Sequence, residues 1–263
     1  MPTFTGKTFA SFYKNLLGID QTSNTGVDAT TRQMQDGAGN NTAISLSDDV
    51  LSVQPINDDT TGAMLVKTQG GSNILAVDTD NKLVKVGSSQ VSATTLFKEM
   101  GIYDFSPNAA GYHYPLIANT MVVSSGAAAF AYDNDWGNGA DPATALDVSG
   151  LTTTQNAIAV YWYLENAITI DSVRYMATSD GSATLNFHLF EYTLDTSTNH
   201  GDLSSGSVVA NASVAATATT IKTGTFTVDS ANVAAGKVII GFVENVTDTS
   251  DVSVAFNIKY NIQ

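Results

Sequence analysis

Between residues 44 and 87, the alternation of apolar and polar positions describes one small motif twice. Each copy has a short alternating run, an acidic turn and a second alternating run. The paired runs are, in order, Ile44–Leu46 with Val50–Val53 and Leu75–Val77 with Leu83–Val86. Period-two alternation around Asp and Asn residues predicts β-hairpins. Two such hairpins have too few apolar side chains for a core of their own. We therefore expect copies of the chain to associate through a slender, oligomeric β-shaft.

The residues before this motif have helical periodicity instead. Apolar side chains recur at spacings of three and four at Phe9, Phe12, Tyr13, Leu16 and Leu17, which predicts an amphipathic helix over residues 8–17. Gly18 can end it. This face either caps the following β-region or docks into another protein, and both interpretations stay open.

The rest of the N-terminal half divides into three segments. Residues 20–43 are rich in Thr, Asn, Gly and Asp and predict loops with weak strands. Residues 63–67 predict a further strand. Residues 92–100 predict a second short helix that ends at Gly101, where we place the main boundary. The expected organisation is a docking segment at 1–19, a β-rich shaft at 20–100 and a tip domain at 101–263.

From residue 101 onward the pattern predicts an all-β domain. Short runs with β-propensity alternate with clusters of Gly, Asn, Asp and Ser. The predicted strands are 157–164, 168–177, 183–194, 206–214, 221–228, 237–243 and 252–260. Many short strands with such turns favour a β-sandwich of jelly-roll type. About 160 residues are enough to build that core without a partner.

The net negative charge of the chain excludes some classes of binding partner. The formal net charge is −14, and residues 101–263 hold 15 acidic and only 4 basic side chains. A chain without a basic patch is not expected to bind nucleic acid or an anionic membrane. The chain has no cysteine, and no segment approaches the ~18 apolar residues of a membrane-spanning helix. The first residues lack the apolar core of a signal peptide. We expect synthesis in a cytoplasm and exit, if any, by another route, such as a virus particle released by lysis.

The N-terminal half also resembles a known class of proteins. The segments Gly6–Leu17, Gly26–Asp28, Gln35–Ser47 and Gly71–Asp78, in this order, are similar to N-terminal parts of virion structural proteins of tailed bacteriophages. The resemblance covers roughly residues 5–90. It implies a homotrimeric fibre or spike that is anchored by its N-terminus and carries a distal domain facing the host. It implies no catalytic residues.

One acidic loop is a candidate metal site. Side-chain oxygens of Asp133, Asp135, Asn138 and Asp141, together with carbonyl groups near the glycines, could surround a calcium ion. The spacing departs from an EF-hand, because Thr144 stands where the bidentate glutamate would be. The alternative is a solvated turn held by Asx hydrogen bonds.

Aromatic residues supply the candidate receptor site. Tyr132 and Trp136 lie in a loop rich in Gly, Asn and Asp, where exposed rings could stack on sugars. In the run Tyr161–Tyr163 the central Trp162 must point away from its two neighbours. One side of that run is then core and the other is surface or a subunit interface.

Catalytic signatures are missing from the sequence. His113, His188 and His200 are scattered without metal-ligand spacing, and His188 is expected at the surface or satisfied by neighbours. No nucleophile elbow, P-loop or dinucleotide fingerprint occurs. Glycoside hydrolysis needs only two carboxylates close in space, and the glutamates available for it are Glu165, Glu191 and Glu244. We expect a protein that is not an enzyme.

The sequence thus predicts a phage virion appendage, a fibre or spike that attaches to the host through its C-terminal β-sandwich. Three alternatives stay open: a capsid or tail decoration or adaptor protein, a glycan-cleaving tailspike, and a non-viral carbohydrate-binding module. The expected partners are two further copies of the chain, other virion proteins at the N-terminus, and a host-surface glycan or protein.

Overall fold

The computed structural model of the chain describes residues 16–21, 26–87, 91–119, 136–146, 159–196, 202–218 and 220–263. The chain divides into two units, an N-terminal unit, Met1–Thr94, and a C-terminal unit, Thr95–Gln263. Both are built from antiparallel strands, and no α-helix occurs among the described residues. The all-β prediction is therefore confirmed for this part of the chain.

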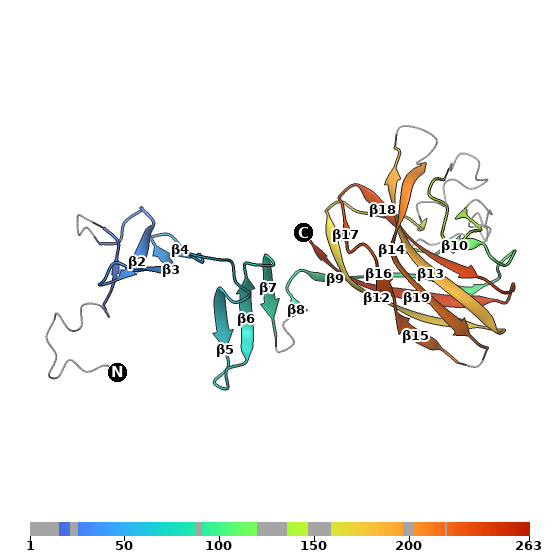
Figure 1. The fold of residues 1–263 in the computed structure, drawn as a ribbon, viewed down its shortest axis with the longest axis horizontal. Coiled ribbons are helices and arrows are strands. Elements are labelled where there is room, and N and C mark those ends of the chain that lie inside the picture. The colour runs from blue at the N-terminus through green and yellow to red at the C-terminus, as the bar shows by residue number, and fades with distance from the viewer. Residues whose placement is uncertain are drawn as a thin grey trace. The chain divides into compact units, whose positions relative to one another are not determined.

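The N-terminal unit contains two four-stranded sheets, each with its strands in chain order (Figure 1). The first sheet consists of β1 (Leu17–Ile19), β2 (Arg32–Asp36), β3 (Asn41–Leu46) and β4 (Leu51–Val53). The second consists of β5 (Met64–Lys67), β6 (Asn73–Asp78), β7 (Leu83–Val86) and β8 (Val91–Ser92). Both predicted hairpins are confirmed, because β3 pairs with β4 and β6 pairs with β7.

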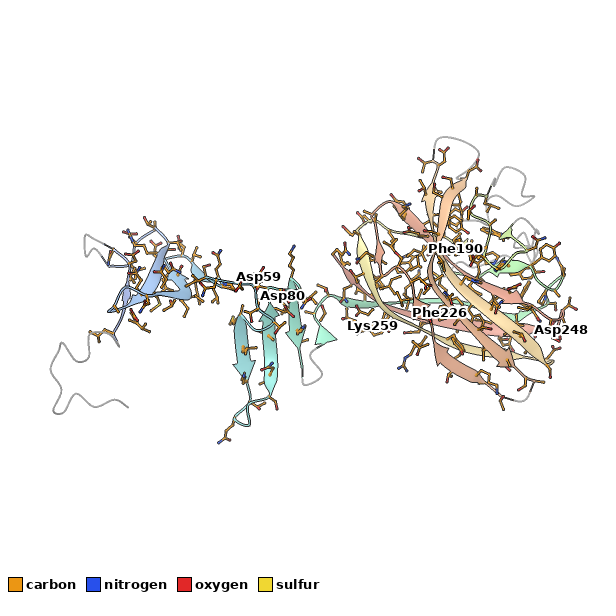
Figure 2. The ribbon with its side chains drawn as sticks, in the orientation of Figure 1. Asp59, Asp80, Phe190, Phe226, Asp248 and Lys259 are labelled. Carbon is orange, nitrogen blue, oxygen red and sulfur yellow. The ribbon has the colours of Figure 1, made fainter. Side chains whose placement is uncertain are left out.

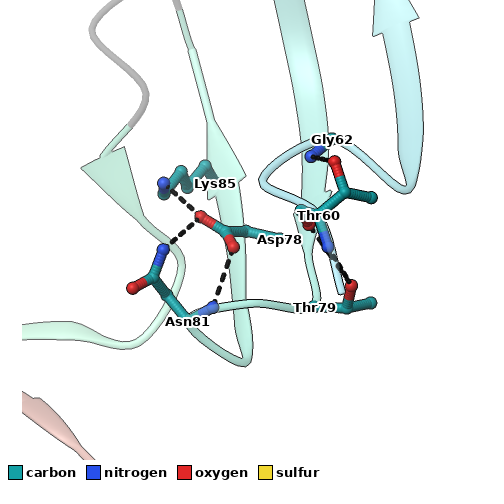
Figure 3. A network of polar contacts seen from close by, with 6 residues as sticks. All are labelled: Thr60, Gly62, Asp78, Thr79, Asn81 and Lys85. Carbon is teal, nitrogen blue, oxygen red and sulfur yellow. Dashed lines mark hydrogen bonds and ion pairs between the residues drawn. The ribbon is translucent and has the colours of Figure 1, made fainter. Parts of the chain in front are cut away.

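The acidic turn of the second hairpin is held by one carboxylate (Figure 3). Asp78 accepts hydrogen bonds from the backbone amide of Asn81 at 2.9 Å and from its side-chain amide at 3.0 Å. The Lys85 ammonium lies 2.5 Å from the same carboxylate, whose side chain is fully covered. These hydrogen bonds, that of Lys85 above all, lower the pKa of Asp78 to about 2. The turn is therefore locked by a charged group at neutral pH.

The N-terminal unit has almost no buried apolar side chain. Among its described residues only Ala76 is a buried apolar residue, and both hydrophobic clusters of the chain belong to the C-terminal unit. In β5, three consecutive residues, Met64, Leu65 and Val66, are exposed. Consecutive strand residues point to opposite faces, so both faces of this sheet present apolar side chains.

The predicted helices are not found where the structure can test them. Leu17, at the end of the predicted helix 8–17, begins strand β1, while residues 8–15 lie outside the described residues. The helix predicted over 92–100 is wrong, because residues 95–105 form β9 (Thr95–Phe105). This strand pairs with the last strand of the chain from Thr95 to Phe105. The division between the units consequently falls at Thr94, six residues before the predicted boundary.

The C-terminal unit contains two larger antiparallel sheets. The first, the β13 sheet, has the order β10 (His113–Pro115), β18 (Lys237–Asn245), β13 (Ala183–Leu194), β14 (Leu203–Ala216) and β16 (Thr227–Val228), with β11 (Trp162–Tyr163) beside β18. The second, the β12 sheet, has the order β15 (Lys222–Thr225), β12 (Ile168–Ser179), β19 (Val252–Ile262) and β9, with β17 (Asn232–Val233) beside β12.

The inner faces of these two sheets share one core, so the unit is a sandwich-like pair of layers. Phe187 on β13 lies 4.9 Å from Tyr175 on β12 and 5.5 Å from Phe256 on β19, measured between ring centres. Phe226, labelled in Figure 2, packs 4.8 Å from Phe256. Phe226 also interrupts the strand predicted over 221–228, which divides between β15 and β16 in different sheets.

The outer face of the β13 sheet carries a second apolar cluster. Phe190 and Tyr192 on β13 and Phe242 on β18 are covered there by Trp136 and Tyr161. Strand β18 is buried on both faces, which explains its almost unbroken apolar run. Among the residues that the structure describes, one sheet of the sandwich is therefore covered on its outer face, whereas the β12 sheet is not.

Candidate functional site

The uncovered outer face of the β12 sheet carries an open groove of about 1140 Å³. Its floor is low because small residues stand in register across two strands: Gly101 on β9 lies opposite Ala255 on β19. A Cβ atom on Gly101 would meet the Val254 carbonyl oxygen at 2.9 Å, so this position requires a glycine. Met176 on β12 continues the same row beside Ala255.

A row of polar residues runs parallel to this floor. On each strand, the polar residue lies two positions away from the floor residue. Glu99 on β9, Asn257 on β19 and Arg174 on β12 are direct cross-strand neighbours. Side chains opposite each other in a sheet have Cβ atoms roughly 5 Å apart. None of these three side chains makes a hydrogen bond or ion pair with any residue that the structure describes. The row therefore presents an acceptor, an amide and a guanidinium to a ligand.

Apolar side chains stand at the rim of the groove. Tyr103 on β9 is 85% exposed, and Ile221 before β15 is 70% exposed. The alternation of β12 and β19 creates this arrangement, since Tyr175 and Phe256 point into the core and their neighbours point outward. The sequence gives no signal for the residues of the groove, because they lie on strands far apart in the chain rather than in one loop.

A second arrangement that the sequence did not predict lies on the outer face of the β13 sheet. The rings of His113 on β10 and His188 on β13 are 5.1 Å apart, and both side chains are buried. His113 Nε2 lies 3.9 Å from Glu244 Oε2, and His188 Nε2 lies 3.6 Å from Asp141 Oδ1. The expectation that His188 is at the surface is therefore wrong, because the 136–146 segment covers it.

Burial controls the protonation of this histidine pair. Loss of solvent, together with the neighbouring His113, lowers the pKa of His188 to about 4, although Asp141 opposes the shift. Burial also lowers the pKa of His113, although Glu244 opposes that shift. His113 Nε2 and His188 Nδ1 are buried and have no hydrogen-bond partner among the described residues. The pair is accordingly neutral at pH 7.

The predicted receptor site is not formed as expected. Trp136 is only 3% exposed, and its ring packs 5.6 Å from that of Phe242. Its proposed role as an exposed stacking ring is wrong, because the loop folds over the outer apolar cluster and buries it. Tyr132 lies outside the described residues. In the run Tyr161–Tyr163, Trp162 joins the inner core, Tyr161 joins the outer cluster and Tyr163 is exposed.

The candidate calcium ligands are only partly described. Asp133 and Asp135 lie outside the described residues, whereas Asn138 and Asp141 are exposed. Asp141 faces His188 rather than a group of further carboxylates. Within the described ranges, no three His, Cys, Asp or Glu side chains are placed to hold a metal ion. The calcium site stays a prediction.

The predicted docking residues are only partly described. Of the docking residues, Phe9, Phe12 and Tyr13 lie outside the described residues, while Leu16 and Leu17 are exposed.

The glutamates considered for hydrolysis do not converge on one site. Glu244 pairs with Asn186, five residues along β13 from Glu191. This is a distance of roughly 17 Å. Paired carboxylates in glycosidases are about 5–9.5 Å apart, so these two cannot act together. Glu165 is exposed between β11 and β12.

Comparison with known proteins adds no assignment, because no family model and no curated protein sequence matches the chain. Among the described residues, no helix is long and apolar enough to cross a membrane. A functional assignment therefore has to rest on the geometry of the two units.

Proposed function

We propose that the chain is a structural appendage of a tailed-bacteriophage particle, a homotrimeric fibre or spike that attaches the particle to its host. In this proposal the N-terminal unit forms the intertwined stalk and its first residues dock to other virion proteins. The C-terminal unit is the tip that contacts the cell surface.

The observation that carries the proposal is that the described residues of the N-terminal unit form no hydrophobic core. Its short strands expose apolar side chains on both faces, from Leu17 in β1 to Val86 in β7. Apolar side chains that are exposed together on the faces of a sheet mark a surface that another chain covers. Further copies of the same chain are the simplest source of covering surface, because each copy brings the same unpartnered strands. The resemblance inferred from the segments between residues 5 and 90 leads to the same proposal.

The strand order of the C-terminal unit supports its assignment as a jelly-roll tip. One sheet has the order β9-β19-β12-β15 and the other β10-β18-β13-β14. Most connections in this order pass from one sheet to the other, and β13–β14 is a hairpin within one sheet. We infer a jelly-roll, an arrangement shared by viral and lectin domains.

Attachment is supported by the groove on the β12 sheet. It offers uncommitted polar side chains beside an exposed aromatic ring, which is the composition of a binding surface rather than of a solvated face. Three such tips on one stalk would gain avidity, since the second and third contacts form at high effective concentration. Weak single-site binding is then sufficient for stable attachment.

The proposal is tested by the solution mass of the full chain and of residues 95–263, measured by light scattering on a sizing column. We expect a trimer for the full chain and a monomer for the shorter one, whose core is self-contained. The fragment must start at residue 95, because a later start would cut β9. A monomeric full chain would remove the stalk and contradict the proposal.

A further inference from the structure

We propose that the groove on the outer face of the β12 sheet binds a neutral oligosaccharide, with pyranose rings lying across strands β9, β19 and β12. This inference rests on the proposed attachment function and names the chemical class of its ligand. The proposed binding site lies on the β12 sheet, whereas the sequence predicted it in the loop around Trp136.

The chemistry of the groove matches the two sides of a sugar ring. A pyranose presents an apolar face of C–H groups and a rim of hydroxyl groups that both donate and accept hydrogen bonds. The groove has an apolar floor at Gly101, Ala255 and Met176 and a polar row at Glu99, Asn257 and Arg174. A sugar lying on the floor would therefore direct its hydroxyl groups at a carboxylate, an amide and a guanidinium.

The exposed ring of Tyr103 completes this arrangement. The ring is 85% exposed at a β-bulge, where β9 has one more residue than β19 between Ile102 and Phe105, so it does not contribute to the core. Tyrosine supplies a large, rigid surface with an apolar body and a polar tip. Tyr103 lines the groove together with Gly101, which lies two residues before it on β9. It is placed to stack against a ring that occupies the groove.

Size and charge define the ligand further. A groove of about 1140 Å³ exceeds the roughly 300–1,000 Å³ of small-molecule pockets, so it suits several linked rings. Glu99 and Arg174 give the polar row one charge of each sign. The whole chain has a formal charge of −14, which repels strongly anionic polysaccharides. A neutral chain of sugars meets all three conditions.

The test uses the full chain and a panel of immobilised oligosaccharides. The probes are neutral oligomers of glucose, galactose, mannose and N-acetylglucosamine, with a sulfated polysaccharide as the anionic comparison. We expect binding to at least one neutral oligomer and none to the sulfated one. Tyr103→Ala and Arg174→Ala should each weaken that binding about tenfold, because each removes one contact to the sugar.

The matched control is Tyr163→Ala. Tyr163 is also an exposed strand tyrosine, 57% accessible, but it lies on β11 in the other sheet. Thermal melting of all three variants checks that they fold, and light scattering checks their mass. The inference predicts wild-type sugar binding for Tyr163→Ala and an unchanged mass for all variants.

Three results would overturn the inference. Failure of every neutral probe to bind, or equal weakening by Tyr163→Ala, would remove the groove as a sugar site. A lower oligomeric mass of Tyr103→Ala or Arg174→Ala would instead make this face an interface between copies. Adsorption of the full chain to host cells distinguishes the two proposals. If adsorption persists while every sugar probe fails, attachment stands and the oligosaccharide inference falls.

Discussion

At the scale of single residues, the buried histidine pair has the clearest physical consequence. His113 and His188 approach each other from neighbouring parts of one sheet, with Glu244 and Asp141 as the acidic groups that face them. Asn186 donates to Glu244 at 2.8 Å and so holds that carboxylate in place. Because burial disfavours the charged imidazole, acid should destabilise this side of the sandwich.

We predict a loss of stability between pH 7 and pH 5. The pKa of His188 is about 4 in the folded chain and 6.5 when unperturbed, so the unfolded state takes up the proton first. The contribution of neutral His188 to the free energy of unfolding is present above about pH 6.5 and is lost as the pH falls toward 4. By pH 5 the loss is roughly 2 kcal/mol, which thermal melting would detect.

The variant His188→Leu tests the assignment of this effect. An apolar side chain of similar size has no proton to gain, so the melting temperature of the variant should depend less on pH. An unchanged pH profile would place the acid sensitivity elsewhere in the chain.

At the scale of elements, the second N-terminal hairpin depends on its turn rather than on a core. Asp78 holds Asn81 and Lys85 (Figure 3), whereas Asp80, two residues away and labelled in Figure 2, is exposed and makes no hydrogen bond or ion pair with the described residues. A substitution of Asp80 can therefore serve as the control for the same substitution of Asp78 in this turn.

We predict that Asp78→Ala loosens strands β6 and β7, whereas Asp80→Ala does not. Removing the Asp78 carboxylate leaves Lys85 and the Asn81 amide without their acceptor. Amide hydrogen exchange in β6 and β7 should become about tenfold faster in Asp78→Ala than in the wild type. Equal exchange in the two variants would mean that contacts between copies of the chain, rather than the turn, hold this hairpin.

At the scale of the whole molecule, two units with different sources of stability share one chain. The C-terminal unit encloses its own core, and the N-terminal unit leaves its apolar strands exposed. The proposed assembly through the N-terminal unit and binding through the C-terminal unit rest on this difference.

We predict that the chain is a component of virus particles. Mass spectrometry of particles purified from the lysate in which the chain is produced should detect its peptides together with the other virion proteins. The soluble fraction of the same lysate serves as the control for carry-over. Peptides confined to that fraction would contradict a virion location.

The sequence by itself determined those strands and hairpins whose apolar and polar residues alternate regularly. Alternation predicted the hairpins at 44–53 and 75–86, and the run 183–194 matches β13 from end to end. Such patterns are local, because the direction of each side chain in a strand depends only on its parity. The all-β class followed from the same rule.

Only the tertiary structure decided what depends on pairing between distant strands. The apolar spacing of residues 92–100 suits a helix, but hydrogen bonding to β19 makes the segment a strand. The polar row of the groove joins positions 99, 174 and 257, and the histidine pair joins positions 113 and 188. Trp136 is buried because its loop crosses an apolar face. Strand register and loop packing are long-range properties, and no local pattern encodes them.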